Sequence, residues 1–196
     1  MHDGKNEIIF QIKGSSAFLK GSVYLWGHQE KIIISDVDGT VTKSDMLGHI
    51  LPRLGASDWA HSGIAKLYTN ISHNGYKMLY LSSRPIGYSE HTKDYLKNIQ
   101  QDSKSVMPDG PLLLSPDRLV KSVYREMIIK KPHIFKIKCL KEIKDLFPQD
   151  SEPFYAGFGN RNTDYISYKS LSIGVNKIFI INPKGEITQF DQQFYQ

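Results

Sequence analysis

One stretch, residues 31–45, constrains the fold of this chain more than any other part. It reads KIIISDVDGTVTKSD, a short β-branched apolar run that ends in Asp36 and Asp38, followed by Gly39 and Thr40. Such a run is typical of a strand buried on both faces of a sheet. Side chains two residues apart in an extended segment point the same way, so the two carboxylates lie together. Close carboxylates need a cation or a shared proton, which indicates either a metal site or an acid/base pair.

The size and composition are those of an ordinary globular protein with a substantial core. The chain has 196 residues, of which 40% are hydrophobic and 23% charged. No apolar run approaches the ~20 residues that a membrane span needs, and the N-terminus has no signal-peptide pattern. The single cysteine, Cys139, lies in a helical apolar pattern, which favours a core thiol in a reducing compartment.

The formal charge of +5 includes one local concentration of six lysines. Three interpretations of such a face are open: it is plain solvated surface, it attracts anionic substrates, or it rests on anionic lipid. No nucleic-acid-binding motif is present, so we expect no nucleic-acid partner. The lysines concerned are Lys130, Lys131, Lys136, Lys138, Lys141 and Lys144.

Helical and strand patterns alternate along most of the chain. Helical spacing of apolar residues covers residues 46–54, 64–71, 88–99, 115–128 and 135–147. Strand-like runs cover residues 76–81, 111–114, 154–158 and 177–181. This alternation predicts an α/β fold with a doubly wound, mainly parallel sheet and helices on both faces.

The N-terminal segment differs from the rest of the chain. Residues 7–26 resemble short β segments interrupted by glycine and serine, so we predict a β appendage over residues 1–29 and a main domain over residues 30–196. An isolated hairpin is marginally stable in water. The appendage must therefore pack on the main domain or pair with strands from elsewhere.

Three of the predicted strands end in polar clusters. In a parallel sheet the carboxyl ends of the strands share one edge, so these clusters meet in one crevice. Carboxylates, an amide and hydroxyls suit Mg2+ together with a phosphate, whereas zinc prefers His or Cys ligands. The clustered residues are Asp36, Asp38, Ser82, Arg84, Asn160 and Asp164.

The order of these clusters resembles a known superfamily. DVDGT is similar to the first motif of haloacid dehalogenase (HAD) phosphatases, Ser82 to the second, Lys131 with Pro132 to the third, and Asn160 with Asp164 to the fourth. Six longer blocks resemble the catalytic lobe of the lipins, which are Mg2+-dependent phosphatidate phosphatases, and run from about residue 23 to residue 189. They are DVDGTVTKSDMLGHILPRLG, NGYKMLYLSSRPIG, GPLLLSP, KKPHIFKIKCL, EPFYAGFGNRNTDYISYK and NPKGE.

The resemblance implies a HAD-like fold and a two-step reaction. Asp36 is then the nucleophile that forms an aspartyl-phosphate, and Asp38 is the acid/base. Mg2+ is expected on Asp36, Asp164 and the carbonyl of Asp38, with Asn160 reaching the ion or one of its waters.

Phosphate binding is expected from several further groups. The backbone near Gly39 and Thr40, the Ser82 hydroxyl and a lysine would contact the phosphoryl oxygens. We favour Lys131 as that lysine, with Lys136 as the alternative. Arg84 either binds phosphate or pairs with an aspartate. Asp164 has a second interpretation as a helix cap, and both of its roles can hold together.

The resemblance also implies a substrate and a place of action. About 40 residues separate the first two clusters, which leaves no room for a large cap, and an open site suits a headgroup of phosphatidate at a membrane. We expect a cytoplasmic protein peripherally associated with anionic membranes; the resemblance suggests the endoplasmic reticulum or nuclear envelope. Lipins carry an N-terminal region that completes a β-sandwich, so residues 7–26 are expected to be its other half.

Two alternatives to this interpretation stay open. The first is a HAD phosphatase that acts on a soluble phosphoester. The second is a phosphatidate-binding module without catalysis, against which the three aspartates argue. The chain itself is either a fragment or a shortened relative, and the β appendage then needs the missing N-terminal region or a partner chain.

Overall fold

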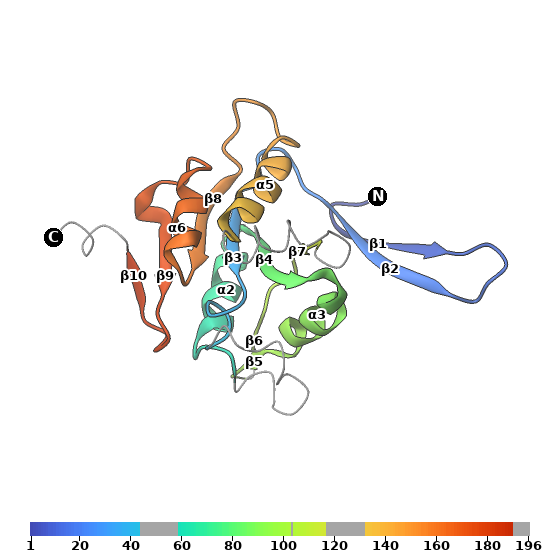
Figure 1. The fold of residues 1–196 in the computed structure, drawn as a ribbon, viewed down its shortest axis with the longest axis horizontal. Coiled ribbons are helices and arrows are strands. Elements are labelled where there is room, and N and C mark those ends of the chain that lie inside the picture. The colour runs from blue at the N-terminus through green and yellow to red at the C-terminus, as the bar shows by residue number, and fades with distance from the viewer. Residues whose placement is uncertain (44–58, 103, 117–131, 190–196) are drawn as a thin grey trace.

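The structure is a computed structural model that describes residues 1–43, 59–102, 104–116 and 132–189. Its centre is one six-stranded sheet (Figure 1), made of β3 (Ile32–Asp36), β4 (Lys77–Pro85), β7 (Leu112–Ser115), β8 (Phe154–Gly159), β9 (Ile178–Ile181) and β10 (Ile187–Gln189). The strand order is β10-β9-β8-β3-β4-β7. Neighbours run parallel except the edge pair β9–β10. The predicted mixed α/β fold with a mostly parallel sheet is therefore confirmed.

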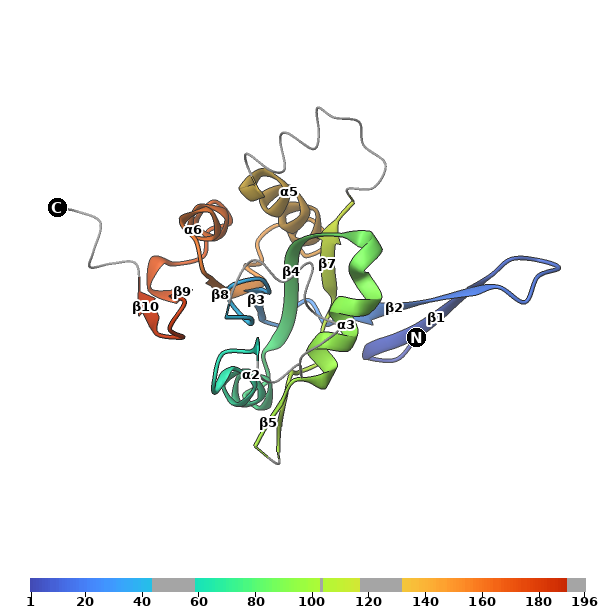
Figure 2. The same cartoon turned by 60° about the horizontal axis from the view of Figure 1, so that its bottom comes forward.

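Side chains of β3 alternate between two cores, one on each face of the sheet. Ile33 packs in the core that includes residues of α2 (Ile64–His73) and α3 (Ser89–Asn98). Ile32 and Ile34 pack in the core that includes residues of α5 (Pro132–Lys144) and α6 (Asn162–Lys169). Figure 2 shows α2 on one side of the sheet and α5 with α6 on the other. A strand covered on both faces is apolar at successive positions, which explains the sequence of β3.

Several boundaries differ from the sequence prediction. β4 continues to Pro85 because Pro85 pairs with Ser115 of β7, so Ser82 and Arg84 lie on the strand and not after it. The prediction missed β10 and the short hairpin of β5 (Gln100–Gln101) and β6 (Ser105–Val106). Two 3-10 turns are also present, η2 (Ile86–Tyr88) and η3 (Val175–Lys177). The helix predicted over residues 46–54 lies wholly outside the described residues, and the helix predicted over residues 115–128 lies largely outside them.

The N-terminal segment forms a hairpin of β1 (Gly4–Gln11) and β2 (Phe18–Leu25), as the sequence indicated. It extends away from the six-stranded sheet (Figure 1). Its base is tied to the segment before β7 through Tyr24, whose hydroxyl lies 2.9 Å from Asp109 Oδ1 and 3.1 Å from the carbonyl of Gly110. Lys5 also pairs with Asp109 at 3.0 Å. The division into two units at residue 29 stays a prediction.

No helix within the described residues is long and apolar enough to pass through a membrane.

Candidate active site

Two aspartates from neighbouring strand ends meet at one buried lysine. Asp36 ends β3, Asp164 lies in the first turn of the helix after β8, and Lys136 comes from α5. The Nζ of Lys136 is 2.5 Å from Asp36 Oδ1 and 2.6 Å from Asp164 Oδ1. Asp36, Lys136 and Asp164 are 4%, 5% and 1% exposed. We call these three side chains the acidic trio, because with both carboxylates ionised they carry a net negative charge.

Burial and charge act in opposite directions within the acidic trio. The pKa of Asp36 is raised to about 7, first of all by burial; Lys136 acts against this rise, whereas Asp164 and Asp38 add to it. Burial alone would lower the pKa of Lys136, but the carboxylates of Asp36 and Asp164 raise it above its usual range. Burial therefore disfavours the charged form of Asp36, while Lys136 and the carboxylates stabilise one another's charged forms.

Asp164 is held by the backbone that links β8 to α6. Its Oδ2 accepts hydrogen bonds from the amides of Asn160 and Arg161, each at 3.0 Å. Gly159 permits this approach, since a Cβ there would lie 2.3 Å from the Cβ of Asp164. Asp164 thus caps α6 through one oxygen and turns the other toward Lys136.

The loop after β3 is wound around the carbonyl of Val37, which accepts three backbone amide hydrogen bonds. Gly39 has a φ of 80°, a conformation that glycine adopts without steric cost. Its amide donates to Thr42 Oγ1 at 2.9 Å, and the Thr40 hydroxyl donates to Asp36 Oδ2 at 3.3 Å. Two groups predicted to contact phosphate therefore hold the loop and orient Asp36 in this structure.

Asp38 lies beside β4 and pairs with its polar residues. Arg84 Nη2 is 2.6 Å from Asp38 Oδ1, and Arg84 Nε is 2.9 Å from the same oxygen. The Ser82 hydroxyl donates to Asp38 Oδ2 at 2.8 Å. The sequence left two roles open for Arg84, phosphate binding and pairing with an aspartate. In the structure Arg84 pairs with Asp38. Ser82, predicted to bind phosphate, lies at the same carboxylate.

The lysine that the sequence favoured, Lys131, lies outside the described residues, whereas the alternative, Lys136, is in the site. A sequence signal did exist for Lys136. It lies four residues before Leu140, which is fully buried, so the two share the face of α5 that packs on the sheet. A lysine on an apolar helix face needs a buried partner, and Asp36 and Asp164 are those partners.

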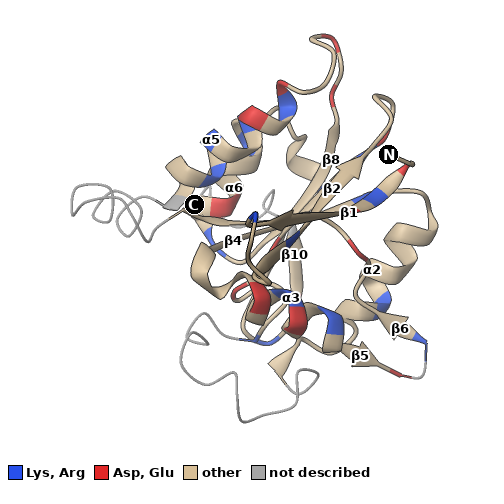
Figure 3. Cartoon of the chain, turned by 90° about the vertical axis from the view of Figure 1, so that its right-hand side faces the viewer, with Lys and Arg blue, Asp and Glu red and all other residues tan. Residues whose placement is uncertain are grey.

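The basic face of α5 is smaller than the sequence suggested. Lys136 is buried, and Lys144 pairs with Glu152 at 3.0 Å. Lys138 and Lys141 are exposed. Figure 3 shows charges of both signs along α5. Of the four described lysines of the predicted cluster, Lys138 and Lys141 are therefore the ones that face solvent, while Lys130 and Lys131 lie outside the described residues.

The donors at the site fit a hard ion that keeps few protein ligands. Among the described residues, no three His, Cys, Asp or Glu side chains form a group that could hold a metal ion on their own. Asp36 and Asp164 contribute carboxylates, and the other predicted donors, Asp38 through its carbonyl and Asn160, are also oxygen donors. Mg2+ is commonly bound by one or two carboxylates together with waters and phosphate oxygens. This donor set suits Mg2+ and does not suit zinc.

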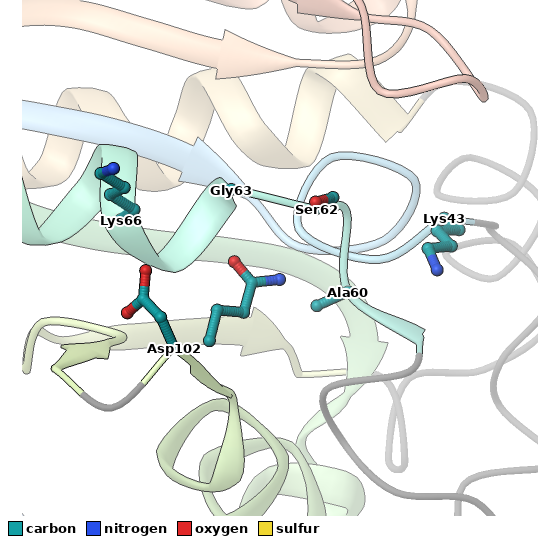
Figure 4. Close-up of a pocket in the computed structure, with 7 residues that line it drawn as sticks. Lys43, Ala60, Ser62, Gly63, Lys66 and Asp102 are labelled. Carbon is teal, nitrogen blue, oxygen red and sulfur yellow. The ribbon is translucent and has the colours of Figure 1, made fainter.

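A separate cavity of about 490 Å³ lies at the N-terminal end of α2 (Figure 4). Lys43 and Lys66 lie at its opposite ends. Its lining consists of Lys43, Ala60, Ser62, Gly63, Lys66, Gln101 and Asp102. None of these is a predicted site residue, so charge and burial, and not cavity volume, identify the candidate site.

Comparison with known proteins agrees with the sequence resemblance. Phosphatidate phosphatase LPIN1 of Homo sapiens is 50% identical over 192 residues, which cover 96% of this chain and 21% of that protein. Phosphatidate phosphatase PAH1 of Arabidopsis thaliana is 50% identical over 191 residues, which cover 95% of this chain and 21% of that protein. The chain thus spans about a fifth of the length of these curated relatives.

A solved structure and a protein family also match. The structure of DsGPDH of Dunaliella salina aligns with a TM-score of 0.51 and 16% identity, covering 79% of this chain and 24% of that chain. This is a likeness of fold alone. The family LNS2 (Lipin/Ned1/Smp2) matches residues 1–196. The chain therefore belongs to the LNS2 family of lipin, Ned1 and Smp2.

Proposed function

We propose that this chain is the catalytic lobe of a Mg2+-dependent phosphatidate phosphatase with a HAD-like, doubly wound fold. It hydrolyses phosphatidate to diacylglycerol and phosphate. The observation that carries the proposal is the acidic trio at the carboxyl edge of the parallel sheet, with Asp38 two residues beyond Asp36. The names of the similar proteins, both phosphatidate phosphatases, support the choice of substrate.

In the first step, a carboxylate oxygen of Asp36 forms a bond to phosphorus and the bond from phosphorus to the glycerol oxygen breaks. Asp38 gives a proton to that oxygen as it leaves. Lys136, already on Asp36 Oδ1, offsets negative charge at the reacting centre. The product is diacylglycerol, and the phosphoryl group stays on Asp36.

In the second step, water attacks phosphorus and the bond to Asp36 breaks. Asp38 accepts the proton that the water loses, which returns both aspartates to their starting state. Asp36, Asp164, the Asp38 carbonyl and Asn160 would hold Mg2+, which would supply positive charge to offset the negative charge of the phosphate. Asp164 stays fixed throughout by its two backbone hydrogen bonds.

The proposal extends to where the enzyme works. We place it in the cytoplasm, peripherally bound to anionic membranes that present phosphatidate. The exposed Lys138 and Lys141 support this, because they lie on the helix that carries Lys136 and attract anionic lipid. A further N-terminal region or a partner chain is the proposed partner of the β1–β2 hairpin.

The test is phosphate release from phosphatidate in mixed micelles, with Mg2+ or with excess chelator, beside a panel of soluble phosphoesters. Activity should require Mg2+ and should be much faster on phosphatidate than on any of the soluble phosphoesters. Asp36→Asn should lower the rate by at least about 1,000-fold, with a circular dichroism spectrum that shows the chain still folded. Wild-type turnover by Asp36→Asn would refute the mechanism. Equal rates on soluble esters would indicate a soluble phosphatase, and binding of phosphatidate without release would indicate a binding module.

A further inference from the structure

We infer that Arg84 is a positioning residue that, together with Thr92 of α3, sets the orientation of the Asp38 carboxyl for proton exchange with the leaving group and with water. The inference rests on the proposed function. It assigns Arg84 a role through Asp38 in place of direct phosphate binding, and it brings α3 into the catalytic apparatus.

Three hydrogen bonds join Arg84 to Asp38 and involve both oxygens of the carboxylate. Arg84 Nε lies 2.9 Å from Oδ1 and 3.1 Å from Oδ2, and Nη2 lies 2.6 Å from Oδ1. Ser82 Oγ adds a third donor at Oδ2. A planar guanidinium that meets a carboxylate along one edge restrains its rotation, which a lysine ammonium does not do.

Thr92 holds the opposite side of the guanidinium. Arg84 Nη1 donates to Thr92 Oγ1 at 3.2 Å, and the Thr92 hydroxyl donates to the carbonyl of Tyr88 at 2.9 Å. Because a hydroxyl has one hydrogen, which here bonds to Tyr88, its oxygen is left as an acceptor for Arg84. The direction of each hydrogen bond from the Tyr88 carbonyl through Thr92 and Arg84 to Asp38 is thereby fixed, and we call this chain of hydrogen bonds the relay.

All three nitrogens of the Arg84 guanidinium have protein partners. Nε and Nη2 contact Asp38, and Nη1 contacts Thr92. These bonds use three of the five guanidinium N–H groups, and a phosphate could take the Nε–Nη2 edge only by displacing Asp38. The geometry therefore favours action through Asp38.

The surroundings of the relay are largely closed to solvent. Arg84 is 9% exposed and Thr92 is fully buried. The hydroxyl of Tyr95 is also near this pair. Burial raises its pKa, Arg84 acts to lower that pKa, and Asp38 acts to raise it. Desolvation offsets much of the attraction in a buried ion pair, so such a pair contributes little net stability to the fold. A pair of this kind that includes the proposed acid/base points to orientation as its role.

The test compares two substrates that differ in their need for a proton. The glycerol oxygen of phosphatidate must be protonated as it leaves, whereas p-nitrophenolate leaves without a proton. We expect Arg84→Met to lower steady-state phosphate release from phosphatidate by about 100-fold. First-turnover release of p-nitrophenolate from p-nitrophenyl phosphate should stay within about 3-fold of wild type. Arg84→Lys, which keeps the charge without the planar edge, should recover only a small part of the loss.

Substitutions at Thr92 test the relay without changing Arg84 or Asp38. Thr92→Val should lower phosphatidate turnover by about 3- to 10-fold, and Thr92→Ser, which keeps the hydroxyl, should recover it. Thr69→Val is the matched control, because Thr69 also bonds a backbone carbonyl, that of Val106 at 2.7 Å, but lies on α2. It should leave the rate unchanged.

A spectroscopic readout keeps the inference testable if a variant loses activity for other reasons. The Nε proton of Arg84, observed by nitrogen-15 NMR, should exchange slowly with solvent, and faster in Asp38→Asn and in Thr92→Val. Fast exchange in the wild-type chain would overturn the inference. Equal losses on both substrates in Arg84→Met would overturn it too, since they would mark a phosphate ligand. A wild-type chain that does not hydrolyse phosphatidate would instead overturn the proposed function, with the exchange rates still reporting on the relay.

Discussion

The acidic trio and the β1–β2 hairpin distribute charged and apolar side chains in opposite ways. In the trio, three charged side chains are at most 5% exposed. In the hairpin, Leu19 is 74% and Phe10 60% exposed. Charged groups are thus buried at the carboxyl ends of inner strands, while large apolar groups face solvent on the hairpin, which extends away from the sheet (Figure 1).

This contrast shows that the two regions depend on different forces. The trio persists because its charges neutralise one another in part and because strand ends and a helix turn fix their positions. The hairpin gains little free energy from apolar burial, so its pairing depends on backbone hydrogen bonds and on contacts at its base such as that of Tyr24 with Asp109. Loss of one charge should therefore damage the site far more than loss of an apolar group damages the hairpin.

The largest effect is expected from Lys136→Met. It leaves two buried carboxylates without their cation, which should lower the free energy of unfolding by about 3–5 kcal/mol. Urea denaturation in metal-free buffer measures this. Lys138→Met, an exposed lysine on the same helix, is the matched control and should stay within about 0.5 kcal/mol of wild type.

A second substitution identifies the source of that loss. Adding Asp36→Asn to Lys136→Met removes one of the stranded charges, so the double variant should be more stable than Lys136→Met alone. If Lys136→Met were as stable as Lys138→Met, the trio would not depend on charge compensation.

An intermediate effect is expected from the same substitution at two leucines. Leu81 on β4 is fully buried, and its replacement by alanine should cost about 2–5 kcal/mol. Leu19→Ala on the hairpin should cost less than about 0.5 kcal/mol, because that side chain is already exposed. Thermal and urea unfolding of the two variants measure the difference. Equal costs would mean that the Leu19 side chain is buried in solution.

The parts of the fold that local patterns specify were predictable from sequence. The apolar run before Asp36 indicated a buried strand, and the alternation of strand and helix patterns indicated the parallel order around it. β10 was missed because its short polar sequence, Ile187–Gln189, carries little strand signal of its own. It pairs only because the turn before it folds the chain back on β9.

The composition of the site was less predictable than its location. Sequence order placed Asp36 and Asp164 at one sheet edge, but the choice between Lys131 and Lys136 depends on how α5 packs. The role of Arg84 was open for a similar reason. Register pairs Asp36 with Leu81, which brings the loop after β3 level with Arg84, and such cross-strand distances are not encoded in either segment alone.

The smallest effect is expected where the backbone itself supports the trio, at Gly159. A Cβ there would lie 2.3 Å from the Cβ of Asp164 and 2.9 Å from its Oδ2, so Gly159→Ala must move the turn that holds this carboxylate. We expect a loss of about 1–3 kcal/mol in unfolding free energy. The weaker hold on Asp164 should also raise the Mg2+ concentration needed for half-maximal activity.

Gly27→Ala, beyond the hairpin, is the control for this substitution. A Cβ at Gly27 would have its nearest neighbour, Glu30 Cγ, at 3.8 Å, an ordinary van der Waals contact. Its unfolding free energy should stay within about 0.5 kcal/mol of wild type. A Gly159→Ala protein that matched this control in both stability and Mg2+ requirement would show that Asp164 is not held in place by the close approach of β8. The position of Asp164 would then depend on its hydrogen bonds with Lys136 and with the amides of Asn160 and Arg161.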